Sequence, residues 1–253
     1  MPGLDAYLLV FGRVSGLFLS APVFSSRQLP VMVRVLLTAA LALMLARMVH
    51  IPQGAELANS GLFIMALAGE VLIGYAIGFV AYFIFAAVQL AGQLVDMQMG
   101  FGIVNVINPE SGATSPLVGS LFYLVALLVY LGLNGHHQLL MAVYDSYRFI
   151  PVLGVDLAGG FARLLVDLGA FMFVAAVKIA APVVAAVFVA DVALGFMARS
   201  VPQMNVFLVG IPLKILAGLV MLLLTMPVFV WVLQVYFDRF FSYLDQALMA
   251  LAR

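Results

Sequence analysis

Several apolar segments of this chain are much longer than a lipid bilayer is thick. Leu62–Leu94 runs for 33 residues without a proline, which is about 50 Å of helix, whereas the hydrocarbon core of a bilayer measures roughly 30 Å. Only 9% of the residues are charged, against about 25% in soluble domains. The sequence therefore predicts an all-α integral membrane protein, because barrel strands are far shorter. Such helices must tilt, bend or extend beyond the bilayer inside a larger assembly.

Short polar links divide the apolar segments into long, tilted helical hairpins within one domain, 1–253. Prolines and glycines mark these links, and short links join antiparallel neighbours. We expect a hairpin over 4–50, a second over 62–133 with a loop inserted at 97–116, an interfacial helix at 137–150, a long hairpin over 161–237 and an amphipathic C-terminal helix at 238–253. Pro182, Pro212 and Pro227 are expected to kink or interrupt the long hairpin.

The stretch from Asp96 to Pro116 does not read as a helix, because glycines and prolines interrupt it repeatedly. Its first half is nevertheless apolar, which argues against disorder. The candidate residues of this loop are Met97, Met99, Gly100, Phe101, Gly102, Ile103, Val104, Val106, Ile107 and Pro109. Non-helical backbone at membrane depth is tolerated only where protein buries it or a cavity surrounds it. Two interpretations stay open: a loop that plugs a pore, and a re-entrant loop that only packs.

Polar residues inside the apolar segments are further candidates. Gln89, Gln93 and Asp96 share one helical face that leads into the loop, so they form either a lumen- or partner-facing stripe or an interfacial helix end. Intramembrane charges are functional candidates by default, but they also make ion pairs between helices or subunits. Candidates for packing or ion pairs are Arg13, Glu70, Gly74, Gly78, Lys178, Asp191, Arg199 and Lys214. The two glycines have the small-xxx-small spacing that permits close helix approach.

The sequence carries no recognisable catalytic or cofactor motif. Gly-x-Ser-x-Gly, His-Glu-x-x-His and Gly-x-x-x-x-Gly-Lys are all absent, and the lack of cysteine excludes a thiolate metal site. His136 and His137 are adjacent and do not share a helix face, which disfavours a metal role. Eleven basic and 11 acidic residues leave no charge excess for nucleic acid. We therefore expect no enzyme and no cofactor. The alternative to a structural subunit is a small-solute or ion transporter that uses the intramembrane charges.

Two stretches of the sequence, Gly92–Pro109 and Val201–Lys214, carry distinctive motifs. Both resemble the FliR family, the flagellar members of the type III secretion export-gate proteins. Ala21-Pro22, Pro30, Arg34, Asn134-Gly135-His136 and Pro182 also fall where that family has such residues. The resemblance covers essentially the whole chain, and the injectisome SctT family is similar but more distant.

The resemblance implies a non-enzymatic subunit of the flagellar export gate, located in the bacterial inner membrane at the flagellar basal body. Family members assemble with FliP, FliQ, FlhB and FlhA, contact membrane lipid, and pass unfolded export substrates. They resemble a fusion of FliP-like and FliQ-like helices. In the family, the loop that matches Met97–Pro116 projects into the pore and helps to plug it. The resemblance thus favours the plug over the packing loop, and a gate over a transporter.

Overall fold

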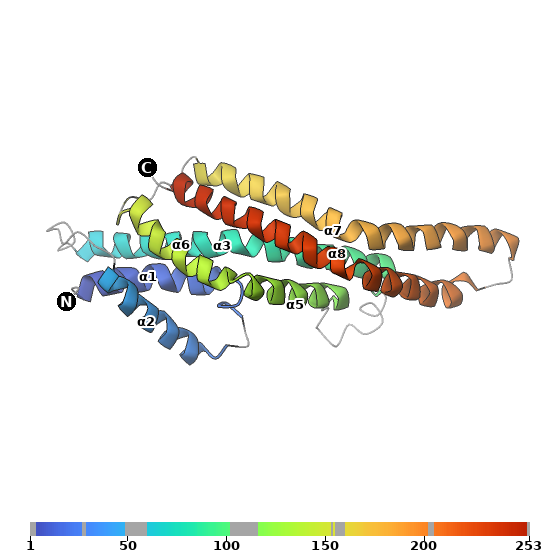
Figure 1. The fold of residues 1–253 in the computed structure, drawn as a ribbon, viewed down its shortest axis with the longest axis horizontal. Helices are drawn as coiled ribbons and strands as arrows, with labels where there is room; N and C mark the ends of the chain where they lie inside the picture. The colour runs from blue at the N-terminus through green and yellow to red at the C-terminus, as the bar shows by residue number, and fades with distance from the viewer. Residues whose placement is uncertain are drawn as a thin grey trace. The chain divides into compact units, whose positions relative to one another are not determined.

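The computed structural model describes residues 4–26, 29–48, 60–101, 116–152, 154, 160–201 and 205–251, and every helix or strand assigned in these ranges is an α-helix (Figure 1). In chain order the helices are α1 (Leu4–Ser20), α2 (Val31–Met48), α3 (Ser60–Met99), α5 (Leu117–Gly132), α6 (Gly135–Phe149), α7 (Gly160–Ser200) and α8 (Val206–Leu251). The predicted all-α class is confirmed.

Two helices are longer than the sequence pattern predicted. α3 ends at Met99, so Met97 and Met99 belong to its last turn and not to the loop. The expectation of a separate helix at 238–253 is wrong, because α8 continues without a break to Leu251.

The prolines do not interrupt the long hairpin. Pro182 lies inside α7, and Pro212 and Pro227 lie inside α8. A proline removes one backbone hydrogen bond and strains its own turn. Breaking the helix would leave several backbone groups unsatisfied in apolar surroundings, which costs more.

The corner between α5 and α6 follows the predicted helix end at Asn134-Gly135. Asn134 has φ 55° and ψ 31°, the left-handed conformation that asparagine tolerates. Its carbonyl accepts the N–H of His137 at 2.9 Å and so starts α6. A Cβ on Gly135 would lie 2.1 Å from the Tyr130 ring, so only glycine fits here. α6 therefore begins two residues before the predicted position.

The helices form two compact units, and neither is a continuous piece of chain. Unit 1 comprises Met1–Ile84, Tyr130–Gly169 and Phe237–Arg253, and unit 2 comprises Phe85–Val129 and Ala170–Tyr236. α3, α5, α7 and α8 each contribute to both units. The overlong helices predicted from the sequence therefore contribute to both units, and so does the shorter α5.

Unit 1 is built on α1. Nine of its 17 residues are buried, among them Leu9, Val14 and Leu17. α1 packs against α2, as the Tyr7 hydroxyl shows by donating to the Ala39 carbonyl at 3.5 Å. The rest of the core comes from α3, α6 and the end of α8, and includes Ile73, Ile77, Val80, Leu139, Val143, Phe237, Leu244 and Leu248.

Unit 2 packs the end of α3 with α5, α7 and most of α8. Phe122 of α5 stacks on Phe229 of α8 with ring centroids 4.4 Å apart. Phe85 and Tyr123 bring α3 and α5 together in the same way, at 5.5 Å. Other buried side chains of this unit are Val88, Val95, Ala126, Ala176, Val183, Val187 and Leu222.

Within the described ranges, four helices are long and apolar enough to cross a membrane: α2, α3, α7 and the Leu208–Met249 part of α8. α5 and α6 together make a fifth candidate with a bend between them. Large apolar side chains also remain exposed on these helices, for example Met32 at 72%, Leu223 at 75% and Trp231 at 63%. Apolar surface of this extent marks contact with a membrane or with other proteins.

Candidate functional site

The end of α3 sets the entry to the predicted plug loop. Met97 is exposed, whereas Met99 is buried against Gly218 of α8, where an added Cβ would lie 2.7 Å from the methionine side chain. Gly100 then turns the chain with φ 90°, which glycine adopts without strain. The Phe101 N–H donates to the Asp96 carbonyl at 3.0 Å. The two methionines that the sequence pattern assigned to the loop therefore have different surroundings: Met97 is on the surface of unit 2 and Met99 is in its interior.

The remaining candidate loop residues are Gly102, Ile103, Val104, Val106, Ile107 and Pro109. They lie outside the described residues, so the plug stays a prediction.

The three residues of the predicted polar stripe differ in exposure: two are exposed and Asp96 is buried. Gln89 and Gln93 are exposed on α3, and their lumen- or partner-facing role stays a prediction. Asp96 departs from the stripe, because its side chain is only 5% exposed. Its Oδ1 accepts the Val118 N–H at 3.0 Å and its Oδ2 accepts the Gly119 N–H at 3.2 Å. Helical periodicity placed Asp96 correctly on α3 but could not show that α5 covers this position.

Arg13, the charge in the middle of α1, is fully buried in unit 1. Its Nε and Nη2 donate to the two carboxylate oxygens of Glu70 on α3, at 2.6 and 2.9 Å. This bidentate geometry is the strong form of an arginine–carboxylate pair. The sequence marked both residues as candidates for ion pairs, and the structure makes them partners of each other.

Helix α6 completes the surroundings of Arg13, and sequence reasoning missed this. Nη1 donates to Ser146 Oγ at 2.7 Å and Nη2 donates to the Ile150 carbonyl at 3.2 Å. The Tyr147 ring lies 3.7 Å from Cζ, within cation–π distance. No spacing rule links residues 133 or more positions apart, so only the fold could reveal these contacts.

The predicted close approach at Gly74 and Gly78 is made by α1 of the same chain. A Cβ on Gly74 would lie 1.8 Å from the Arg13 carbonyl oxygen, and one on Gly78 would lie 2.2 Å from Ser20 Oγ. The contact is reciprocal, because a Cβ on Gly16 of α1 would lie 2.2 Å from the Val71 carbonyl oxygen. Gly12 and Gly16 have the same small-xxx-small spacing, a signal visible in the sequence. The glycines let α1 and α3 approach closely enough for Arg13 to reach Glu70.

Charged residues of unit 2 lie on α7 and α8. Lys214 forms an ion pair with Asp191, and both side chains are half-buried. Lys178 and Arg199 are exposed, and within the described residues neither makes an ion pair. Pairing of Lys178 and Arg199 with other subunits stays a prediction.

Removing one member of the Lys214–Asp191 pair is expected to destabilise the chain more than removing both. Lys214→Met or Asp191→Leu leaves an unpaired charge on an apolar hairpin, at a cost of about 2.5–3.5 kcal/mol on membrane-insertion scales. The double variant removes both charges and should unfold at a temperature nearer that of wild type. Thermal unfolding of the purified chain in detergent measures this, with Lys178→Met as the exposed, unpaired control. A double variant that folds and assembles but exports nothing would show that the pair is more than structural.

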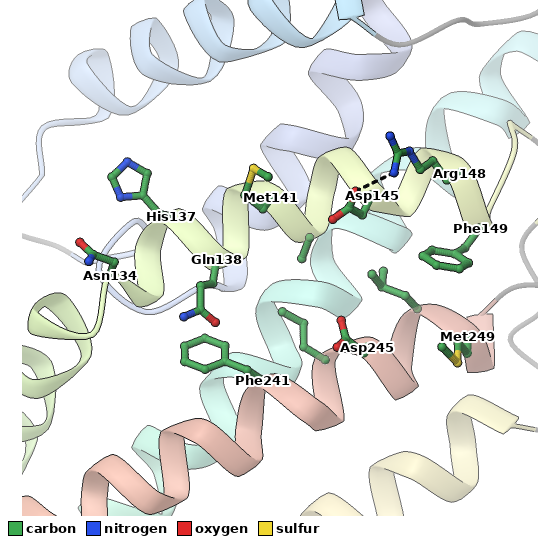
Figure 2. A pocket seen from close by; sticks show the side chains of 13 residues that line it. Asn134, His137, Gln138, Met141, Asp145, Arg148, Phe149, Phe241, Asp245 and Met249 are labelled. Carbon is green, nitrogen blue, oxygen red and sulfur yellow. Dashed lines mark ion pairs between the residues drawn. The ribbon is translucent and has the colours of Figure 1, made fainter.

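A groove of about 620 Å³ lies in unit 1 between α6 and the C-terminal part of α8 (Figure 2). Asp145 and Arg148 form an ion pair at 3.9 Å on its α6 side, and Asp245 lies on its α8 side. His137 lines the groove, but no group of three or more potential ligands in the described residues could hold a metal ion. None of the predicted site residues lines this groove, and we assign no site to it.

These features define a helical membrane protein whose mid-segment charges Arg13, Glu70, Asp191 and Lys214 are paired with one another. Residues 4–240 match the family described as bacterial export proteins, family 1. The flagellar biosynthetic protein FliR of Bacillus subtilis (strain 168) is 41% identical, over 88% of this chain and 86% of that protein. FliR of Escherichia coli (strain K12) is 29% identical over 95% and 92% of the two chains, and FliR of Aquifex aeolicus (strain VF5) is 26% identical over 93% and 90%. The chain belongs to this bacterial export family and, within it, to the FliR proteins.

Proposed function

We propose that this chain, as a component of the flagellar export apparatus, forms and plugs the channel for unfolded flagellar proteins. The closed-state seal is the stretch from Met97 to Pro116, which comprises the end of α3 and the connection to α5. The subunit is not an enzyme, and it assembles with FliP, FliQ, FlhB and FlhA in the bacterial inner membrane at the flagellar basal body. Membership of the FliR proteins supports this reading.

The observation that carries the proposal is the position of the apolar connection. α3 ends at Met99 and α5 begins at Leu117, and the side chain of Asp96 joins the two helix ends. A segment with Gly100, Phe101 and Gly102 follows directly on Met97 and Met99, which lie in the last turn of α3. An apolar constriction blocks ions by dewetting, and methionine side chains adapt to a varied passing polypeptide.

The exposed apolar faces support assembly with partners and lipid. Leu36 of α2, Phe196 of α7 and Leu224 of α8 are exposed by 63%, 67% and 70%. The exposed apolar surface of these helices is expected to be buried by lipid acyl chains or by helices of neighbouring subunits.

The transporter alternative loses its main support. Arg13 forms an ion pair with Glu70, and Lys214 forms one with Asp191, so these four charges neutralise one another. A transporter would instead aim charges and broken helices at a central site, whereas α7 and α8 are continuous through their prolines.

Deleting Gly102–Val106 is expected to make the resting gate leak. The helices that carry the packing are untouched, so the gate should still assemble, and export should persist or fall only moderately. Phe101→Ala and Ile103→Ala remove part of the apolar surface and should leak less than the deletion. Uptake of a small membrane-impermeant dye, or conductance, in cells that make the variant gates measures the leak.

The matched control is a deletion of equal length in another link, 53–57, which should not leak. A loop deletion that assembles fully and stays as tight as wild type would contradict the seal and leave the connection with a packing role only.

A further inference from the structure

We propose that Asp96 is a positioning residue for the seal: its buried carboxylate holds the last turn of α3 to the first turn of α5 and so fixes both ends of the connection. This inference rests on the proposed sealing function. It assigns to Asp96 a task different from the lumen-facing one that the sequence pattern suggested.

The hydrogen bonds of Asp96 join the two helices directly. Oδ1 accepts the Val118 N–H at 3.0 Å and Oδ2 accepts the Gly119 N–H at 3.2 Å. The first N–H groups of a helix have no partner within that helix. α5 begins at Leu117, so Asp96 supplies two of the acceptors that its first turn lacks. The cap comes from the preceding helix, whereas the usual N-cap residue is the one just before the helix.

The charge of Asp96 favours α5 and not α3. A carboxylate in the last turn of a helix lies at the negative end of its macrodipole, which is unfavourable. Asp96 is in the last turn of α3 and buried there. At the N-terminus of α5 the same carboxylate meets the positive end of the dipole. Aspartate at this position is therefore explained by the α3–α5 junction and not by α3 itself.

Two glycines bring the helices close enough for this short side chain. A Cβ on Gly92 would lie 2.2 Å from the Cα of Gly119, so α3 and α5 touch backbone to backbone. Gly92 is one turn before Asp96 and shares its helix face. A larger residue at either glycine would move the α5 amides away from the carboxylate.

The main chain of Asp96 also fixes the exit from α3. Its carbonyl accepts the Phe101 N–H at 3.0 Å, while the Gly100 N–H donates to the Met97 carbonyl at 3.3 Å. The same residue thus binds the outgoing chain at Phe101 through its backbone and the incoming helix through its side chain. A connection anchored at both ends can present its apolar residues in one place.

The test compares Asp96→Asn and Asp96→Ala with Ser120→Ala, an exposed position in the first turn of α5. All three gates should assemble and export. Dye uptake should rise from wild type through Asp96→Asn to Asp96→Ala, because asparagine keeps one acceptor oxygen and turns a donor toward the other amide. Ser120→Ala should stay tight. In the Gly102–Val106 deletion, Asp96→Ala should add no further leak.

Amide hydrogen exchange gives a second measurement on the assembled gate. Loss of a charge-assisted hydrogen bond should speed exchange at Val118 and Gly119 by roughly ten- to a hundredfold in Asp96→Ala. Unchanged exchange at both amides would overturn the inference.

The remaining outcomes separate the two proposals. A tight, assembled Asp96→Ala gate beside a leaking deletion would overturn the role of Asp96 and leave the seal standing. If neither variant leaks although both assemble, the seal itself fails. If both Asp96 variants fail to assemble, Asp96 is a folding residue and the positioning role is wrong.

Discussion

Arg13→Met is expected to destabilise the chain by about 3–5 kcal/mol, because it leaves the buried carboxylate of Glu70 without a partner. Four of the five N–H donors of the guanidinium are used: two bind Glu70, one binds Ser146 and one binds the Ile150 carbonyl. The side chains of Arg13 and Glu70 are 0% and 1% exposed, so water cannot replace these bonds. A loss of this size is a large share of a typical stability of about 5–15 kcal/mol.

The double variant Arg13→Met/Glu70→Leu should be more stable than either single variant, because it removes both buried charges. The stability of the double variant should still be lower than that of wild type, because the Ile150 carbonyl loses its hydrogen-bond donor at a cost of about 1–3 kcal/mol. Unfolding in detergent measures the purified wild type, the two single variants and the double variant, and Arg47→Met, at an exposed site on α2, is the control. If the double variant is no more stable than Arg13→Met, uncompensated charge is not the cause of the loss.

Gly74→Leu is expected to separate α1 from α3 and to abolish assembly. The first atom of the new side chain would lie 1.8 Å from the Arg13 carbonyl oxygen and 3.0 Å from the Leu17 nitrogen. Both are backbone atoms of a helix and cannot move aside as a side chain can. Ordinary overpacking costs about 1–3 kcal/mol, and this change also pulls Arg13 away from Glu70, so we expect a larger loss. Gly78→Leu should act similarly, because Ala21 N would lie 2.7 Å from its Cβ.

The matched control is Gly195→Leu on α7, where no atom lies within 4 Å of an added Cβ. In the purified chain it should leave stability unchanged or raise it slightly, since leucine favours a helix more than glycine does. Size-exclusion profiles and the yield of co-purified export proteins measure both effects. Wild-type yields from both Gly74→Leu and Gly78→Leu would contradict the close approach.

The class of the protein was predictable because it depends on chain-wide properties. An apolar run such as Leu62–Leu94 must be helical in a membrane, since only helices and closed barrels satisfy their own backbone there. The left-handed turn at Asn134 was likewise predictable, because it depends on the local preferences of asparagine and glycine. Helix ends were less predictable: the sequence pattern placed Met99 in a loop, and it expected interruptions at Pro212 and Pro227, where α8 is continuous.

The sequence by itself determined which residues needed partners, and the tertiary structure decided which partners they have. A charge inside an apolar segment at Arg13, a small-xxx-small pair at Gly74 and a carboxylate at Asp96 are local facts of the sequence. Their partners are the Glu70 carboxylate, the backbone of α1 and the first amides of α5. Arg13 and Ser146 are 133 positions apart, and no local periodicity encodes such a contact. Burying an unpaired polar group costs much free energy. This cost is the same wherever in the chain the partner lies, so the fold alone decides which residue becomes the partner.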